Sequence, residues 1–399
     1  MTIASTLAST LLRIHRSSCL SNRTCAIAIV GMLVVGCGDH RGTADPRLDL
    51  VFASATYSVD LVAQSEPDTP LTLVSDIAID SAGRIFVADA LVPQIVVFDG
   101  GVRLLERYEL RGEGPGEFRR IGNLGILPGN ILWVFDPELT RLTLFDPDDL
   151  GYRESVMLFD TQSRGPSEVQ RMTGDTLLLR YSSPALTDYE ESRSAMRRDQ
   201  YLTMDLRDPN RREEVLSVRA QSTFVVREGT GGTAVVDLFG PKSIVRAGRD
   251  GQIHAVWTDT FAVRSHDATG SDRVAWAYEI EPDAAADDEI SAVLEMVGGD
   301  AGGAFASSSI LDSLHRSSRQ LPVVTGFVVD GDGDFWMGVR AAGGKKGRWL
   351  HLTPDGEILG SVDLPASEEI VEVLDDRIIT LPRVPPWEVP ILRIYRWSR

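Results

Sequence analysis

Cysteine is scarce in this sequence, and all of its copies lie near the N-terminus. They are Cys19, Cys25 and Cys37 in a chain of 399 residues. Because no cysteine follows Cys37, the long remainder of the chain cannot form a disulfide bond within itself. We therefore expect a hydrophobic core to hold the fold together, as a chain of this length allows.

Basic residues are few relative to acidic ones. The chain has 40 Lys and Arg against 58 Asp and Glu, which gives a formal net charge of −18. Proteins that bind nucleic acid neutralise its phosphates with a basic surface, so we expect no nucleic-acid partner. The hydrophobic share of 43% and the charged share of 25% are those of an ordinary folded protein.

Long hydrophobic runs are almost absent. One run, at 26–36, follows a polar, basic stretch of 25 residues. It is too short for a membrane-spanning helix, which needs about 20 residues, but it suits the apolar region of a signal peptide. Its end, Val34-Val-Gly-Cys37, resembles the lipobox of bacterial lipoproteins. The resemblance implies a signal peptide at 1–36, lipid attachment at Cys37 and a tether at 37–49. An uncleaved anchor or an ordinary signal peptide is the alternative.

The lipobox resemblance also implies a location. Stable anchoring takes more than one acyl chain, which the cysteine of this lipoprotein class carries. In such proteins an Asp directly after the cysteine commonly retains the protein in the inner membrane, whereas this chain has Gly38 there. We therefore expect an exported protein of the bacterial cell envelope. The outer membrane, on its periplasmic or surface side, is favoured over the inner membrane.

A turn followed by a short apolar strand recurs six times. The copies begin at Ala82, Pro128, Thr173, Asp250, Asp332 and Asp375. Each has Gly or Asp at the turn, and these residues tolerate the positive φ of a tight hairpin. Three of the five steps between copies are 43, 45 and 46 residues long, which is the period of propeller blades. The two longer steps each have room for a blade and an insertion.

The first repeat shows all four strands of a blade. We expect them at 76–80, 84–89, 94–99 and 104–110. Six such units predict an all-β fold, a six-bladed β-propeller of four-stranded blades over residues 50–399. An irregular β-sandwich is the alternative, but six copies in phase argue against it.

The two ends of the chain predict how the ring closes. The last unit has expected strands at 369–374, 377–382 and 391–397 but no fourth strand. An orphan strand at 56–62 precedes the first unit. We expect this N-terminal strand to be the outer strand of the sixth blade, because that pairing joins the ends and removes an open sheet edge.

The first unit resembles an NHL-type repeat. The resemblance lies in Asp80-x-x-Gly-x-Ile-Phe-Val-Ala-Asp89, in Ile95–Asp99 and in Gly112–Phe118. Residues 321–399 resemble the closing blades of uncharacterised bacterial six-bladed propeller lipoproteins. The resemblance covers most of the mature chain and is weakest over 182–240. It implies the fold and export, but no reaction.

Two insertions are expected on one face of the ring. One, at 182–199, lies between the second and third strands of blade 3, and the other, at 282–321, joins blades 4 and 5. Because strands in a blade alternate in direction, both emerge on the same face. Helical spacing of apolar residues predicts a short helix at 287–297, and a second is expected at 309–319, so blades 4 and 5 are joined by a small helical insertion.

No motif predicts a catalytic residue or a metal ligand. Asp330-Gly-Asp-Gly-Asp334 resembles the start of a calcium loop, but Phe335 and Ala341 stand where an EF-hand has Gly and Glu, so we expect a hairpin turn. Gly112–Phe118 lacks the third glycine of a phosphate loop. His254 lies among large apolar residues, which predicts a core histidine. The other histidines after Cys37 show no metal-ligand spacing. They are His40, His266, His315 and His351.

These observations favour a binding or scaffolding module over an enzyme. One expected partner is the membrane, through Cys37. An envelope protein or small ligand is the other, on the insertion-bearing face. That face also carries Trp387 and the loop with Lys345, Lys346 and Arg348, which is either a small anion-binding spot or a solvated loop tip. We expect a monomer without a cofactor. The alternative is a metal-dependent propeller hydrolase or lactonase with channel-bound calcium, but the ligands of gluconolactonase-like enzymes cannot be matched here residue by residue.

Overall fold

The computed structural model describes most of the chain after residue 55. The described residues are 56–66, 69, 71–160, 164–182, 197–221, 223–228, 231–237, 240–267, 272–278, 321–340, 346–382 and 390–399. The predictions for the signal peptide, Cys37, the tether, both helices, Lys345 and Trp387 lie outside them. In this described part every regular element is a strand, and no helix there is long and apolar enough to cross a membrane.

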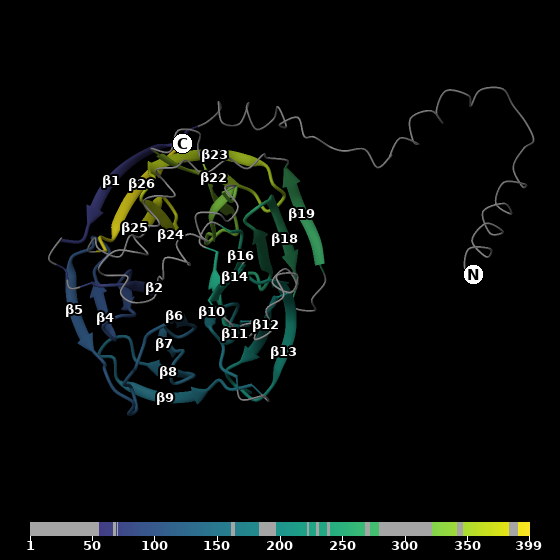
Figure 1. Ribbon diagram of the computed structural model, residues 1–399. Helices are drawn as coiled ribbons and strands as arrows, with labels where there is room; N and C mark the ends of the chain where they lie inside the picture. The colour runs from purple at the N-terminus through teal and green to yellow at the C-terminus, as the bar shows by residue number, and fades with distance from the viewer. Residues whose placement is uncertain are drawn as a thin grey trace, which may run out of the picture. The chain divides into compact units, whose positions relative to one another are not determined.

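Six four-stranded antiparallel sheets form the blades of a β-propeller, as predicted. In blades 1 to 5 the strands follow in chain order, with the first strands, such as β2, β6 and β10, innermost (Figure 1).

The bounds of the strands in these five blades are as follows. Blade 1 is β2 (Val74–Ile79), β3 (Ile85–Asp89), β4 (Gln94–Phe98) and β5 (Leu104–Glu109). Blade 2 is β6 (Asn123–Leu127), β7 (Ile131–Asp136), β8 (Arg141–Phe145) and β9 (Tyr152–Met157). Blade 3 is β10 (Glu168–Arg171), β11 (Thr176–Tyr181), β12 (Arg198–Asp205) and β13 (Arg212–Arg219). Blade 4 is β16 (Ser243–Ala247), β17 (Ile253–Trp257), β18 (Phe261–His266) and β19 (Asp272–Tyr278). Blade 5 is β20 (Val324–Val329), β21 (Phe335–Arg340), β22 (Lys346–Leu352) and β23 (Ile358–Pro365).

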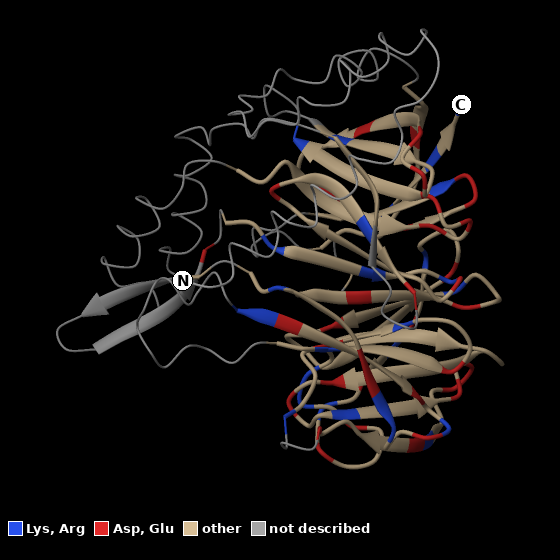
Figure 2. Ribbon diagram, turned by 90° about the vertical axis from the view of Figure 1, so that its right-hand side faces the viewer, with Lys and Arg blue, Asp and Glu red and all other residues tan. Residues whose placement is uncertain are grey.

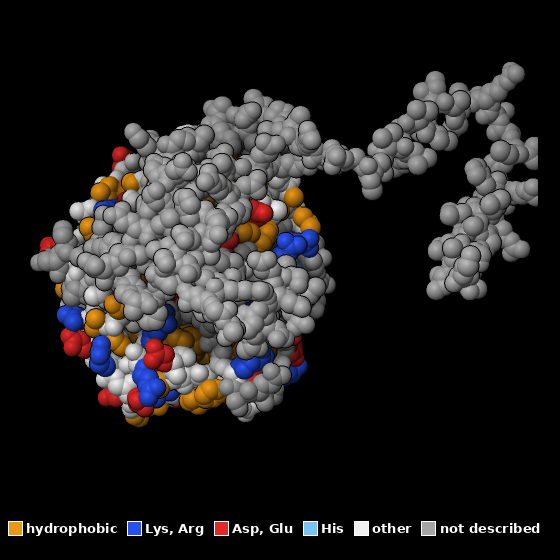
Figure 3. Space-filling view, in the orientation of Figure 1, with side chains coloured by type: hydrophobic (Ala, Val, Ile, Leu, Met, Phe, Trp, Pro, Cys, Tyr) orange, Lys and Arg blue, Asp and Glu red, His pale blue; other side chains and the backbone are white. Residues whose placement is uncertain are grey.

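The core lies between neighbouring blades, which explains the continuous apolar runs of the middle strands. Every residue of β3 and β4 is buried, because each sheet packs on a neighbour at both faces. One cluster joins Phe86 of blade 1 to Leu132 of blade 2. The outer strand β5 is mostly exposed. Figure 3 shows hydrophobic side chains among charged ones at the rim, and the exposed Leu104 and Tyr152 belong to such outer strands.

The N-terminal strand closes the ring, as predicted. β1 (Ser58–Gln64) pairs antiparallel with β26 (Arg393–Ser398), and blade 6 has the order β1-β26-β25-β24, with β24 at Glu368–Leu374 and β25 at Arg377–Pro382. Directly before β1, the amide of Tyr57 donates to the carbonyl oxygen of Ser361 in blade 5 at 2.8 Å. The first and last strands of the described chain, β1 and β26, therefore pair beside blade 5.

Blade 3 differs from its prediction in one respect. The expected insertion at 182–199 reaches into β12, which already begins at Arg198. Part of the long third step also comes from an unpredicted two-stranded sheet of β14 (Thr223–Glu228) and β15 (Gly231–Val236). This hairpin follows β13, the outer strand of blade 3, and forms part of the connection to β16 of blade 4.

Strand direction separates the two faces of the ring. The connections from β11 to β12 and from β19 to β20 leave on one face, so the strand assignments behind the predicted insertion-bearing face are correct. The turns between the first and second strands of each blade lie on the opposite face, which we call the turn face. In Figure 2 many acidic residues, drawn in red, lie on loops along the right-hand side, the side that carries the C-terminus.

Candidate functional site

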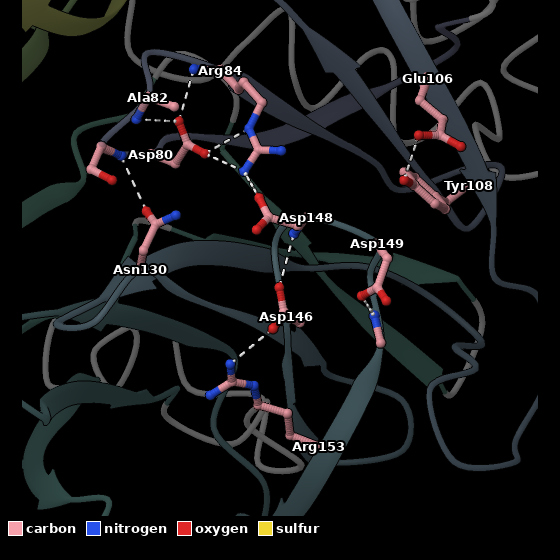
Figure 4. Close-up of polar contacts among 12 residues, drawn as sticks. Asp80, Ala82, Arg84, Glu106, Tyr108, Asn130, Asp146, Asp148, Asp149 and Arg153 are labelled. Atoms are coloured by element: carbon pink, nitrogen blue, oxygen red, sulfur yellow. Dashed lines mark hydrogen bonds and ion pairs between the residues drawn. The ribbon is translucent and has the colours of Figure 1, made fainter.

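The first turn of blade 1 shows how this protein usually handles a turn aspartate. Oδ1 of Asp80 accepts the amides of Ala82 and Arg84 at 3.0 and 2.8 Å, while Oδ2 accepts Nε of Arg84 at 2.7 Å (Figure 4). Arg84 also pairs with Asp148 of blade 2 at 2.8 Å. The carboxylate is thus both a turn-capping group and one half of an ion pair.

Two further turns repeat this arrangement. Asp99 accepts Nε of Arg103 at 3.1 Å, and Asp160 accepts Nε of Arg164 at 2.8 Å. In all three turns the arginine follows the aspartate by four residues. An arginine at this spacing therefore neutralises the turn acid locally.

The first turn of blade 5 has the same backbone conformation as that of blade 1, but its fourth residue after the aspartate is acidic and not basic. Oδ1 of Asp330 accepts the amides of Asp332 and Asp334 at 3.0 and 2.9 Å, as in blade 1. Gly333 has φ 90° and Gly83 has φ 79°, values that an L side chain rarely adopts. The predicted hairpin turn is confirmed. However, Asp334 stands where the other turns have arginine, and Oδ2 of Asp330 accepts Nε1 of Trp336 at 3.0 Å.

His351 of β22 completes this cluster. Its ring is 3% exposed and stacks on Trp336, with 4.4 Å between ring centroids and 10° between planes. Nε2 lies 3.1 Å from Oδ2 of Asp334 and 4.0 Å from Oδ2 of Asp330. Nδ1 lies 3.3 Å from the hydroxyl of Tyr57. Asp330, Asp334 and His351, which we call the blade-5 triad, each offer a ligand atom within 4.8 Å of the others.

The triad sits in an acidic pocket of about 370 Å³ on the turn face. The lining residues are Asp330, Gly331, Asp332, Asp334, His351, Asp375, Asp376, Trp397 and Arg399. Asp376 pairs with Arg396 at 3.1 Å, where both side chains are exposed. A Cβ on Gly331 would lie 3.3 Å from Nη1 of Arg249, so a guanidinium also flanks the turn.

Burial controls protonation in the triad. Burial lowers the pKa of His351, although the carboxylates of Asp334 and Asp330 oppose that shift. Burial likewise raises the pKa of Asp334, and His351 opposes it. A neutral His351 can donate from Nε2 to Asp334 or donate from Nδ1 to Tyr57. The second tautomer aims the Nε2 lone pair at a carboxylate, so a proton or a metal ion must lie between them.

Inner strands hold a second set of acids. Asp76 of β2 accepts Nδ2 of Asn123 and the amide of Leu124, both at 3.2 Å, and burial raises its pKa to about 6. Burial raises the pKa of Glu372 in β24 to about 7, with Arg249 opposing the shift. Oδ1 of Asn123 accepts the amide of Val169, so side chains link blades 1, 2 and 3. Among described residues, neither acid belongs to a cluster of three or more metal-ligating side chains.

Other residues that the sequence singled out have structural roles. His254 is buried, and its Nδ1 lies 2.9 Å from Oγ of Ser265, as expected of a core histidine. In the loop 112–118, Oε2 of Glu117 accepts the amides of Glu113 and Gly114, so the protein's own carboxylate fills the loop. Arg348 is bound to both carboxylate oxygens of Asp363, at 2.8 and 3.1 Å.

Sequence reasoning identified Asp330 and Asp334 as a turn but did not include His351. The strand register explains why, since His351 pairs with Trp336 across β21 and β22 and has no local motif of its own. Tyr57 is 294 residues away and reaches the site only through ring closure. The sequence signal that could have found the site is the acid at the position that arginine occupies in three other turns.

No protein-family model matches this chain, and no curated protein is similar to it in sequence. Several solved structures are similar to this chain over most of its length. A member of the DUF4221 family from Bacteroides vulgatus is 11% identical, with a TM-score of 0.51, and the match covers 85% of this chain and 98% of that one. A streptogramin B lyase is 11% identical with a TM-score of 0.43, covering 86% and 98% of the two chains. A gluconolactonase-like protein is 10% identical with a TM-score of 0.46, covering 87% and 97%. Of these three, only the DUF4221 structure has a TM-score above 0.5, and at 11% identity its likeness concerns the fold alone.

Proposed function

We propose that this chain is an exported, lipid-anchored binding module of the bacterial cell envelope whose acidic pocket takes a cationic ligand. The observation that carries the proposal is the pocket itself, which is lined by five aspartates and one arginine in about 370 Å³. A concave surface lined by one sign of charge concentrates ions of the other sign.

The contrast with the other turns supports a binding role. Asp80, Asp99 and Asp160 are each neutralised within their own turn. The blade-5 turn has a second acid instead, beside the pocket. Its carboxylates therefore leave negative charge facing solvent, where a ligand can offset it.

Few residues separate the proposed anchor from Tyr57, which contacts the triad. The path from Cys37 to Tyr57 is 20 residues, which span at most about 70 Å when extended. Tyr57 contacts His351, so the first described residues after the proposed tether lie beside the triad. A lipid on Cys37 would hold the pocket within reach of the membrane surface.

Cell fractionation tests the anchor. Wild-type protein is expected in the membrane fraction with Cys37 as its lipidated N-terminus. The Cys37→Ala variant should be unprocessed or released, whereas Cys25→Ala, inside the predicted signal peptide, should behave like wild type. A mature N-terminus elsewhere would remove the anchor from the proposal.

Titration with spermidine tests the pocket. The full mature protein in detergent should bind this cation less tightly as salt rises, because salt screens exposed charges. Replacing Asp332 and Asp375 by Asn should weaken binding about five- to tenfold. Asp99→Asn, in a turn remote from the pocket, is the matched control. Equal affinity in all three proteins would contradict a cation-binding pocket.

The hydrolase or lactonase alternative is not favoured. In the described part of the chain, the inner-strand acids Asp76 and Glu372 lack a third converging ligand. An envelope protein or small ligand on the insertion-bearing face stays a prediction, as do the outer-membrane location and the monomeric state.

A further inference from the structure

We propose that Asp330, Asp334 and His351 bind a divalent transition-metal ion. This inference rests on the proposed function, because it names the cation that the acidic pocket takes. Nothing in the sequence motifs assigns such a site, since the ligands come from a turn and from a different strand.

The spacing of the donor atoms suits a small metal ion. In a tetrahedral site with bonds of about 2.0–2.2 Å, neighbouring ligand atoms lie roughly 3.3–3.6 Å apart. Nε2 of His351 lies 3.1 Å from Oδ2 of Asp334 and 4.0 Å from Oδ2 of Asp330. These two distances lie on either side of the ideal value. Side-chain shifts of a few tenths of an ångström would bring all three atoms to bonding distance.

The surroundings orient these donors as metal sites usually require. A metal-binding histidine commonly uses its other ring nitrogen to hold a hydrogen-bond partner, which fixes its tautomer. Here the hydroxyl of Tyr57 lies 3.3 Å from Nδ1, and Trp336 stacks on the ring. Trp336 also donates to Asp330, and the turn amides hold the other oxygen of Asp330. Two of the three ligands are therefore positioned by partners outside the triad.

The ligand types select the class of metal. One imidazole nitrogen and two carboxylate oxygens suit Zn²⁺ or Mn²⁺, whereas Ca²⁺ and Mg²⁺ prefer oxygen alone. Three protein ligands leave further coordination positions open. Because the triad lines a pocket of about 370 Å³, water or a ligand group can occupy those positions.

Blade 1 supplies the matched control. Its turn has the same amide bonds to the aspartate, but Arg84 neutralises that aspartate directly. The Asp334→Arg substitution should therefore fold, because it recreates the pair of Asp80 and Arg84 in blade 5. It should also remove a ligand and place a positive charge in the site.

The experiment uses the full mature protein, without a histidine tag, stripped of metal with EDTA and titrated calorimetrically with Zn²⁺, Mn²⁺ and Ca²⁺. We expect one equivalent of Zn²⁺ to bind, with Ca²⁺ at least a hundredfold weaker. Asp334→Arg and His351→Ala should each weaken Zn²⁺ binding at least a hundredfold, while Asp80→Asn keeps it. Co²⁺ should give the visible absorption of a site with nitrogen and oxygen ligands, and that absorption should be lost in His351→Ala.

The outcomes separate this inference from the proposed function. Absence of Zn²⁺ and Mn²⁺ binding overturns the metal site, and so does an Asp334→Arg variant that folds and binds as tightly as wild type. If spermidine still binds in either case, the cationic-ligand proposal stands without the metal. If Zn²⁺ binds while Cys37→Ala leaves the protein in membranes, the metal site stands and the anchor fails.

Discussion

The first turns of blades 1 and 5 share a backbone conformation, but the charge of the turn aspartate is balanced in different ways. Asp80 and Asp330 each cap their turn with two amide bonds, and a glycine with positive φ stands three residues later. In blade 1 the fourth residue after the aspartate is Arg84, and the charge is neutralised locally. In blade 5 it is Asp334, so the turn has no ion pair of its own, and its negative charge faces His351, Arg249 and any bound cation. Because the turn's hydrogen bonds use only the aspartate at its start, the residue four places later is free to change.

The residue after each turn shows the same divergence. Phe86 and Trp336 are both the second residue of their strand, and both are fully buried. The guanidinium of Arg84 lies 5.5 Å from the centroid of Phe86, whereas Trp336 stacks on His351. Trp336 adds an N–H group, which Asp330 accepts. The blade-1 turn is therefore held mainly by its neighbours in sequence, while the blade-5 turn also depends on distant strands.

The largest effect on stability should come from removing β1, which completes blade 6 and contacts blade 5. Deleting residues 56–64 removes β1 and Tyr57, and it exposes the edge of β26. We expect aggregation and loss of the folded monomer, measured by size-exclusion chromatography and thermal unfolding. Deleting 38–49 is the control and should leave melting unchanged. A monomeric deletion variant that melts like wild type would contradict closure by β1.

Truncating the buried aromatic residue should distinguish the two turns by function and not by stability. Trp336→Ala and Phe86→Ala should each lower the free energy of unfolding by about 3–5 kcal/mol, because each leaves a cavity. Only Trp336→Ala should also weaken Zn²⁺ binding, since it frees Asp330 and His351. Urea unfolding and calorimetry measure the two effects. Equal loss of Zn²⁺ binding in both variants would show that Trp336 acts through stability alone.

Asp76 allows a third way of neutralising an acid, by a proton. Its pKa of about 6 in the folded state is above the ordinary value of 3.8, so the folded state binds the proton more tightly. Below pH 3.8 the protonated Asp76 contributes its full stabilisation of the folded state, and this contribution is lost as the pH rises to about 6. The loss amounts to about 3 kcal/mol. Asp76→Asn should flatten this pH dependence and raise the melting temperature at pH 8. Asp99→Asn is the control, and a similar flattening there would exclude Asp76 as the cause.

The smallest effect should come from exchanging the two turn residues themselves. Arg84→Asp should lower the free energy of unfolding by about 1–2 kcal/mol, because the side chain of Asp80 is buried and loses its partner. Asp334→Arg should leave stability unchanged or raise it by less than about 1 kcal/mol. Urea denaturation of the two single variants measures both changes. Effects of the same sign and size would mean that the two turns are electrostatically alike.

Much of the fold follows from local sequence. The turn glycines and the apolar runs after them predict the strands of each blade to within a few residues, as in β25, expected and found at 377–382. The unpaired strand at the N-terminus predicts ring closure, because an open edge is unfavourable. Among the described residues the β14–β15 hairpin has no counterpart in the other blades, so the repeat could not reveal it.

The candidate site could be predicted only in part, for a physical reason. A hairpin turn is encoded by neighbouring residues, since Asp330 bonds to amides two and four places along the chain. His351 and Trp336 meet through strand register, and Tyr57 meets them through the pairing of β1 with β26. By itself the sequence determined the repeating blades, the acidic balance and the acid at position 334, because these are properties of local order. Only the tertiary structure decided that this acid would face a buried histidine, because closing the ring brings together side chains that the chain keeps far apart.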